Sequence, residues 1–203
     1  MSLPIEIAPT FLLASSSEYR KSILSKLGFA FQSASPEVDE SRLFGESATD
    51  LVKRLSLLKA KSLRCEFNQH FIIGSDQVAV IVNNHDEILG KPLTKAEAHV
   101  QLRKCSAQTV RFFTGLTLIN PNGNVQTEYE TFDVTFRNLS EQQIERYINA
   151  DMPLDCAGSF KSEGLGVALF EKMHGRDPNT LVGLPLIMLC DMLIKEGIDI
   201  LTL

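Results

Sequence analysis

The chain of 203 residues lacks tryptophan, and none of its four cysteines forms a CxxC pair or a cluster with histidine. Disulfide frameworks and zinc sites are therefore not indicated, and we expect reduced, mostly buried thiols. No apolar run is long enough to cross a membrane, and Met1–Thr10 lacks the basic start of a signal peptide. These absences predict a cytoplasmic protein with no membrane partner.

Positive charge is also in short supply, since 20 lysines and arginines face 25 acidic residues and the net charge is −5. A broad nucleic-acid surface is basic, so nucleic acid is not an expected partner. A negatively charged small ligand would need a local basic pocket that works against the overall charge. With 44% hydrophobic and 22% charged residues, the chain is expected to form a single globular domain over 1–203 with a sizeable core.

Apolar residues recur with strand and helix spacing in alternation along the chain. Strands are expected at 11–14, 71–82, 110–119, 125–136 and 167–173, and helices at 18–27, 49–65, 94–105, 140–150 and 184–195. The turn sequence at 120–124 predicts a hairpin between two of these strands, which a purely parallel sheet would not contain. The sequence therefore predicts an α/β protein with a mixed sheet.

The stretch 72–78, Ile-Ile-Gly-Ser-Asp-Gln-Val, places a single carboxylate in an otherwise apolar strand. A buried carboxylate is costly unless a cation, a metal or hydrogen bonds satisfy it. Asp76 is therefore either a satisfied structural acid or a working one, and the spacing alone does not separate the two.

A hydroxyl-rich turn, Ser15–Ser17, follows the first strand and precedes a helix that carries Arg20. Such a turn directs hydroxyls and backbone N–H groups to one point, where Arg20 would close on a phosphate in bidentate fashion. A simple serine N-cap is the more common explanation of the same pattern.

Three further segments carry candidate groups that also have ordinary explanations. Glu40 ends an acidic run at 37–40, which is either a solvated loop or a source of a carboxylate for a divalent cation. Lys59 lies in the second helix and, on spacing alone, is an ordinary surface lysine. Lys91 stands between a glycine and a proline, which hold it in a defined place. A glycine-rich stretch at 158–166 lacks the lysine spacing of a P-loop.

Short motifs in these segments follow one another in a characteristic order. They are Leu13-Ala14-Ser15-x-Ser17 with Arg20, Val38-Asp39-Glu40, Lys59-Ala60, Gly74-Ser75-Asp76-Gln77-Val78, Gly90-Lys91-Pro92, Thr114-Gly115, Ala157-Gly158-Ser159 and Val182-Gly183-Leu184-Pro185. In these motifs the chain closely resembles the Maf family of nucleotide pyrophosphatases, from about Phe11 to Ile194. The resemblance implies a curved mixed sheet flanked by helices, with a deep cleft between two lobes. It also implies a fold shared with inosine triphosphate pyrophosphatases, and a homodimer.

The resemblance implies hydrolysis of a nucleoside triphosphate between its α and β phosphorus atoms, with Mg²⁺ or Mn²⁺ as the divalent metal cofactor. Asp76 would accept a proton from water or bind the metal, two roles that the sequence does not separate. Glu40 would be the partner metal carboxylate. The groups that would hold the triphosphate are the catalytic Lys59 and Lys91, with Ser15, Ser17 and Arg20 as substrate-binding residues.

Within the family, the segments Cys156–Gly164 and Gly175–Thr180 look like the branch that hydrolyses 7-methyl-GTP. N7-methylation makes guanine cationic, so Tyr19 would stack on it and Glu163 would accept from its N1 and N2 edge. Gln77 would add a polar contact. The ordinary alternative is that Glu163 points to solvent.

Two other functions stay open on the sequence. One is the same chemistry on dTTP, UTP or another noncanonical nucleotide. The other is a nucleotide-binding regulator of cell division without turnover. Two positions also depart from the family pattern, since Glu18 replaces the usual proline and Leu58 a common glutamate. Glu18 places a negative charge near the proposed phosphate loop, although at the first helical turn it favours the helix dipole.

Overall fold

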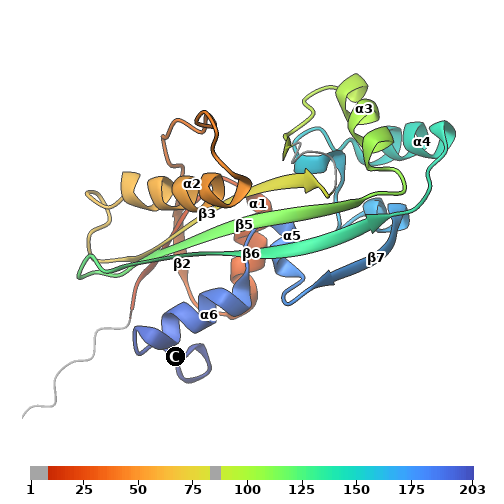
Figure 1. Ribbon diagram of the computed structural model, residues 1–203. Helices are drawn as coiled ribbons and strands as arrows, with labels where there is room; N and C mark the ends of the chain where they lie inside the picture. The colour runs from red at the N-terminus through yellow and green to blue at the C-terminus, as the bar shows by residue number, and fades with distance from the viewer. Residues whose placement is uncertain (1–8, 83–87) are drawn as a thin grey trace, which may run out of the picture.

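The computed structural model describes residues 9–82 and 88–203, and its elements are labelled in Figure 1. The strands are β1 (Phe11–Ala14), β2 (Phe31–Ala34), β3 (Phe71–Ile81), β4 (Ile88–Leu89), β5 (Thr109–Ile119), β6 (Val125–Phe136) and β7 (Phe170–Gly175). The α-helices are α1 (Glu18–Leu24), α2 (Ala48–Ser62), α3 (Lys95–Cys105), α4 (Glu141–Asp151), α5 (Asn179–Val182) and α6 (Leu186–Lys195). Short 3₁₀ turns are η1 (Ser25–Leu27), η2 (Ala157–Ser159), η3 (Leu165–Leu169) and η4 (Ile200–Thr202). The expectation about a signal peptide concerns Met1–Thr10, and residues 1–8 of this range lie outside the described residues.

All of these strands belong to one mixed sheet, in the order β2-β1-β3-β5-β6-β7 with β4 also paired to β3. β1 runs parallel to β2 and β3, whereas the pairs β3–β5, β5–β6 and β6–β7 are antiparallel. The predicted hairpin joins β5 to β6 with Ile119 opposite Val125. The mixed α/β sheet flanked by helices is therefore confirmed.

One edge of β3 changes partner part-way along the strand. β1 pairs with residues 71–74, and β4 pairs with Ala79 and Val80 on the same edge, while β5 follows the other edge from 72 to 81. Among the residues that the structure describes, no strand pairs with 75–78 on that first edge. The sheet therefore opens at the point where Asp76 and Gln77 lie.

Helices cover both faces of this sheet, with α2 on one face and α6 on the other (Figure 1). α2 lies unusually close to the sheet, because two glycines face it. A Cβ built on Gly115 would lie 2.2 Å from the Val52 carbonyl oxygen, and one on Gly74 would lie 2.2 Å from that of Ser56. The glycines in these two motifs therefore have a packing reason, which is to seat α2 against β3 and β5.

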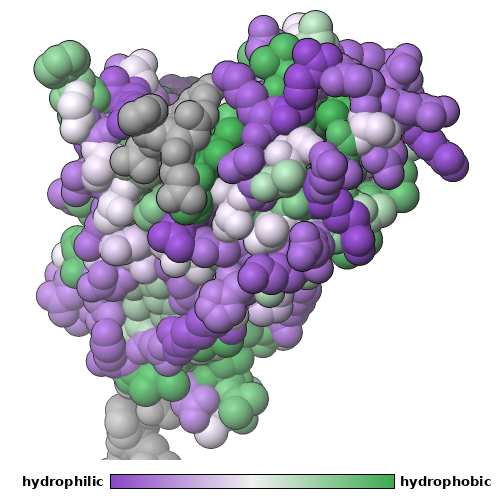
Figure 2. Space-filling view, turned by 45° about the vertical axis from the view of Figure 1, so that its right-hand side comes forward, coloured by the Kyte–Doolittle hydropathy of each residue, from purple (hydrophilic) through white to green (hydrophobic). Residues whose placement is uncertain are grey.

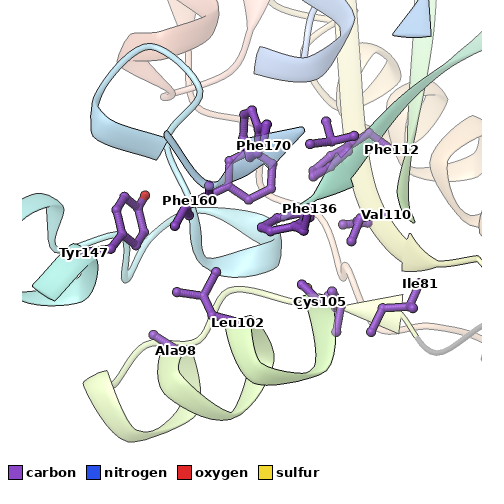
Figure 3. Packing of buried hydrophobic residues seen from close by; sticks show 14 of the residues in the cluster. Ile81, Ala98, Leu102, Cys105, Val110, Phe112, Phe136, Tyr147, Phe160 and Phe170 are labelled. Carbon is purple, nitrogen blue, oxygen red and sulfur yellow. The ribbon is translucent and has the colours of Figure 1, made fainter. Parts of the chain in front are cut away.

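The two largest clusters of buried hydrophobic residues lie toward opposite ends of β3. The first, which we call the N-terminal core, includes Phe11, Leu24 and Leu189 from β1, α1 and α6. The second, the aromatic core, joins α3, α4 and the far ends of β5 and β6 (Figure 3). Phe160 lies at its centre, with its ring edge-on to Phe112, Phe136 and Phe170 at centroid distances of 4.9–5.5 Å. This packing fixes the start of the glycine-rich stretch 158–166.

Several expectations need correction. The strand expected at 167–173 is the 3₁₀ turn η3 followed by β7, and β2 and β4 were not expected. Gly166 packs so tightly that a Cβ there would lie 2.2 Å from the Lys161 carbonyl oxygen, so a compact turn replaces the extended chain. Of the cysteines only Cys105 is fully buried, so the expectation of mostly buried thiols is wrong.

The surface is mainly hydrophilic on the face displayed in Figure 2, with hydrophobic residues exposed in smaller patches. Within 9–82 and 88–203, no helix combines the length and the apolar character needed to cross a bilayer.

Candidate active site

A cleft of about 800 Å³ opens at the unpaired edge of β3. Every residue that the sequence singled out for the site lines it, from Ser15 in the first motif to Glu163 in the glycine-rich stretch. One wall carries Arg20 on α1 and Lys59 on α2, and the opposite wall carries Lys91 and the segment 155–163. Topology thus gathers motifs that lie far apart in the chain, and the deep cleft between two lobes is present.

The centre of the cleft is a buried cation between two carboxylates. Lys59 Nζ lies 2.6 Å from Asp76 Oδ1 and 2.8 Å from Glu40 Oε1. Lys59 and Asp76 are each only 6% exposed, whereas the Glu40 side chain is 60% exposed. The alternative explanation of Lys59 as a surface lysine is wrong, and Asp76 has the cationic partner that its burial requires.

Burial acts on these two carboxylates with opposite net results. Desolvation raises the pKa of Asp76 above its usual range, and nearby Glu40 adds to this, while Lys59 and Arg20 act against it. Burial also works to raise the pKa of Glu40, but the hydrogen bond and charge of Lys59 outweigh it, so that this pKa is lowered. The shift of the Asp76 pKa thus favours a role as proton acceptor, whereas the shift of the Glu40 pKa does not.

The hydroxyl-rich turn after β1 does cap a helix, and it also faces the cleft. Ser17 Oγ accepts from the Arg20 N–H at 3.4 Å, and Ser15 Oγ accepts from the Ser17 N–H at 3.1 Å. Both hydroxyls keep their own protons for a ligand. The cap and the ligand site are thus compatible explanations of one turn. Glu18 is exposed and pairs with Lys21 at 2.7 Å, which offsets its charge near this turn.

Arg20 is held in place by a carbonyl from the far end of the chain. Its Nε donates to the Gly183 carbonyl oxygen at 2.9 Å, and Ser75 Oγ donates to the same oxygen at 2.8 Å. Burial lowers the pKa of Arg20, against the attraction of Asp76 and Glu40, but a guanidinium stays charged at any physiological pH. Gly183 has φ +102°, where other residues are strained, so the glycine of this motif shapes the turn that presents the carbonyl.

Tyr19, which precedes Arg20 on α1, lies close to the segment that carries Asp155, Cys156 and Glu163. Burial, followed by the charges of Cys156 and Asp155, raises the pKa of Tyr19 to about 12. Burial and Asp155 likewise raise the pKa of Cys156 to about 12, and the Cys156 thiol donates to Asp155 Oδ1 at 3.5 Å. An aromatic ring thus lies beside acidic groups, a combination suited to a flat cationic ligand.

Gln77 has a structural task that the sequence did not reveal. Its Nε2 donates to Thr114 Oγ1 at 2.8 Å and to the Thr180 carbonyl oxygen at 2.7 Å, which ties α5 to β3 and β5. Only its Oε1 is left to meet a ligand. Glu163 is exposed, accepts from Ser162 Oγ at 2.9 Å and still lines the cleft. Lys91 is exposed on the same wall.

By their chemistry the two central carboxylates suit a divalent metal that arrives with a phosphate ligand, and Lys59 Nζ lies between them in this structure. Among residues 9–82 and 88–203, no group of three or more His, Cys, Asp or Glu side chains could hold a metal. A hard dication such as Mg²⁺ commonly takes one or two carboxylates and fills its other positions with phosphate oxygens and water. Glu40 and Asp76 would supply that pair.

The order and placement of these motifs agree with a comparison against protein families. The family described as Maf-like protein matches residues 10–196. The chain belongs to the Maf family. A Pseudomonas aeruginosa relative of this Maf chain, named 7-methyl-GTP pyrophosphatase, is 53% identical over 193 residues, covering 95% of this chain and 99% of the relative.

Solved structures of two other proteins are more distant from this Maf chain. A Mycobacterium abscessus protein described as nucleoside-triphosphatase or dITP/XTP pyrophosphatase is 17% identical, covers 64% of this chain and 75% of its own, and has a TM-score of 0.44. The Staphylococcus aureus Ham1 protein is 12% identical, covers 77% and 89%, and has a TM-score of 0.49.

Sequence reasoning missed several residues of the cleft. Asp155, Cys156 and Lys161 line it, although only the segment around them was noted. The Gly183 carbonyl was also missed, because a backbone oxygen leaves no signature in residue type. The position of Gly183 in a conspicuous Val-Gly-Leu-Pro motif was the available signal.

Proposed function

We propose that this protein hydrolyses 7-methyl-GTP to 7-methyl-GMP and pyrophosphate. The observation that carries the proposal is the buried Lys59 between Asp76 and Glu40 in a cleft that also holds Tyr19 beside acidic groups. The 53% identity to a protein named for this activity over nearly the whole chain supports the same conclusion. Such a buried, charged centre exceeds what nucleotide binding alone needs.

The reaction adds water across the α–β phosphoanhydride. The water oxygen bonds to phosphorus, the bridging P–O bond breaks, and the leaving group departs as pyrophosphate or the monophosphate. The water proton passes to the Asp76 carboxylate, whose raised pKa suits a proton acceptor. A divalent metal, when bound at Glu40 and Asp76, would offset phosphate charge and lower the pKa of water.

The basic groups of both walls offset the charge that develops on the phosphates. Arg20 offers its guanidinium from α1 while the Gly183 carbonyl fixes its orientation. Ser15 and Ser17 donate hydroxyl protons to phosphate oxygens, and Lys91 approaches from the opposite wall. Donors fixed before the substrate arrives need no reorganisation during the reaction.

The acidic end of the cleft favours a cationic base. Tyr19 stacks on the 7-methylguanine ring, and Glu163 accepts from its N1 and N2 edge, with Asp155 adding to the negative field. A carboxylate here would repel the carbonyl edge of thymine or uracil. The site therefore prefers a methylated purine to dTTP or UTP.

Pyrophosphate release from 7-methyl-GTP, GTP, dTTP, UTP, CTP and ITP, with Mg²⁺ or Mn²⁺, tests this proposal. We expect 7-methyl-GTP to have the highest kcat/KM and EDTA to abolish release. A preference for dTTP or UTP would keep the chemistry and overturn the base assignment. No release from any nucleotide would favour a binding regulator of cell division instead.

The variant Asp76→Asn separates catalysis from binding. It keeps the shape of the side chain but removes the proton acceptor, so kcat should fall on the order of 10²–10⁴-fold while nucleotide still binds. Asp199→Asn, the same chemical change at the N-cap of η4 outside the cleft, is the matched control. Equal activity in both variants would refute the role of Asp76.

Assembly and location stay predictions at this point. We propose a homodimer in the cytoplasm that binds neither nucleic acid nor membrane. Light scattering coupled to gel filtration measures the mass in solution, and a monomer mass at working concentration would contradict the dimer.

A further inference from the structure

The mechanism above does not connect the segment around Lys91 with the buried turn Ala157-Gly158-Ser159. The structure joins them through Gln101 on α3. Ser159 Oγ donates to Gln101 Oε1 at 2.6 Å, and Gln101 Nε2 donates to the Gly90 carbonyl oxygen at 3.3 Å. Gly90 directly precedes Lys91 in the chain.

The Ser159 end of this connection is rigid. Ser159 is fully buried and has φ +64°, a conformation that a non-glycine residue adopts only where its surroundings hold it. The next residue is Phe160, which is locked among the rings of the aromatic core, and Leu102, next to Gln101, packs in the same core (Figure 3). The side chain of Gln101 therefore extends from a rigidly packed part of α3.

The Lys91 end is held on both sides. Gln101 binds the carbonyl before Lys91, and the Leu93 N–H after it donates to the Leu154 carbonyl oxygen at 3.0 Å. Leu154 immediately precedes Asp155 and Cys156, which line the cleft near Tyr19. The backbone that presents the exposed Lys91 is thus tied at two points to the wall that faces the base.

We propose that Gln101 is a positioning residue that fixes Lys91 relative to the base-binding wall. The distance between the bound base and the lysine that contacts the triphosphate is then set by the protein. This inference rests on the proposed function, because it assigns Lys91 to the phosphates of the nucleotide in this cleft. A small misplacement of a charged group near the reaction is costly in rate, so a residue without substrate contact can affect catalysis.

Gln101→Glu tests the Gly90 end of the connection. The carboxylate still accepts from Ser159 but no longer donates to the Gly90 carbonyl, which it repels. We expect kcat/KM for 7-methyl-GTP to fall between roughly 10-fold and 100-fold. Gln142→Glu, the same charge change at an exposed position of α4, is the control and should stay within about 2-fold of the parent protein.

A double-mutant cycle with Lys91→Ala decides whether Gln101 acts through the lysine. If it does, Gln101→Glu should change kcat/KM by less than about 2-fold once Lys91 is absent. Equal fold-losses with and without Lys91 would overturn the inference, because they would mean a general structural defect. Ser159→Ala breaks the connection at its other end without a new charge and should show the same dependence on Lys91.

Failure of the proposed function has a different signature, namely a parent protein that releases no pyrophosphate. The same cycle is then measured on the dissociation constant for 7-methyl-GTP by calorimetry. Additive losses of affinity in that cycle overturn the inference, and coupled losses support it whatever the fate of the nucleotide.

Discussion

Replacing Lys59 by methionine should lower the free energy of unfolding, because it leaves the buried Asp76 carboxylate without its cationic partner. The 2.6 Å contact with Asp76 corresponds to roughly 6 kcal/mol of gross attraction at an effective dielectric constant of about 20. Most of this offsets desolvation, since both groups are 6% exposed. Removing one partner of such a pair typically costs about 3–5 kcal/mol. We therefore expect Lys59→Met to lose about that much free energy of unfolding near neutral pH.

The pH dependence of this loss has a definite sign. Burial already raises the folded-state pKa of Asp76 above its unfolded value, so its contribution to stability falls as the pH rises through that folded pKa. Without Lys59 the pKa rises further, and the window of loss extends toward neutral pH. Urea unfolding should therefore show a smaller deficit for Lys59→Met at about pH 5.5 than at about pH 8.

The double variant Lys59→Met/Asp76→Asn provides the decisive comparison. With the carboxylate neutralised, most of the lost stability should return, because a buried charge is no longer left unpaired. A deficit that is the same with aspartate and with asparagine at position 76, and that does not change with pH, would refute the electrostatic reasoning. The loss would then come from packing of the lysine side chain alone.

Three further predictions concern other parts of the site. Gly115→Ala should lower the free energy of unfolding in urea by about 1–3 kcal/mol and reduce kcat/KM. The added Cβ would meet the Val52 carbonyl and displace α2, the helix that carries Lys59. Gly90→Ala is the control and should leave stability unchanged, because a Cβ there meets nothing within 4 Å. Glu163→Gln should bring the kcat/KM ratio of 7-methyl-GTP to GTP closer to one in the pyrophosphate assay, and an unchanged ratio would show that Glu163 does not read the base. Because the pKa of Cys156 is raised to about 12, its thiol should react with iodoacetamide at about pH 8 far more slowly than the exposed Cys65. Peptide mass spectrometry measures both rates, and labelling of the two thiols at one rate would contradict the raised pKa of Cys156.

The site was largely predictable because each motif joins an apolar element to a polar group at its end. Asp76 stood out as a lone carboxylate in a strand, and Ser15–Ser17 stood out between a strand and a helix. Lys59 was harder. The buried stripe of α2 includes Val52, Leu55 and Ser56, and Lys59 continues it at helical spacing, whereas the apolar Leu58 beside it is 37% exposed.

Interactions between distant segments were not predictable from local pattern. The Gly183 carbonyl that orients Arg20 lies 163 residues away in the chain, and Gln101 binds a turn 58 residues further along. The turn η3 was also missed, since Val167 and its apolar neighbours read as a strand. There the close contact of Gly166 with Lys161 overrides local β propensity.

The strands that form the floor of the cleft have a consequence for motion. β3 and β5 remain in register from 72 to 81, so both lobes are built on the same hydrogen-bonded ladder and not on a flexible connection. Amide hydrogen exchange should therefore find protection of the N–H groups that pair β3 with β5 beneath the cleft, and heat or urea should unfold both lobes in one transition. The walls would approach a bound nucleotide by a change in sheet twist, with movements much smaller than those of domains joined by a linker.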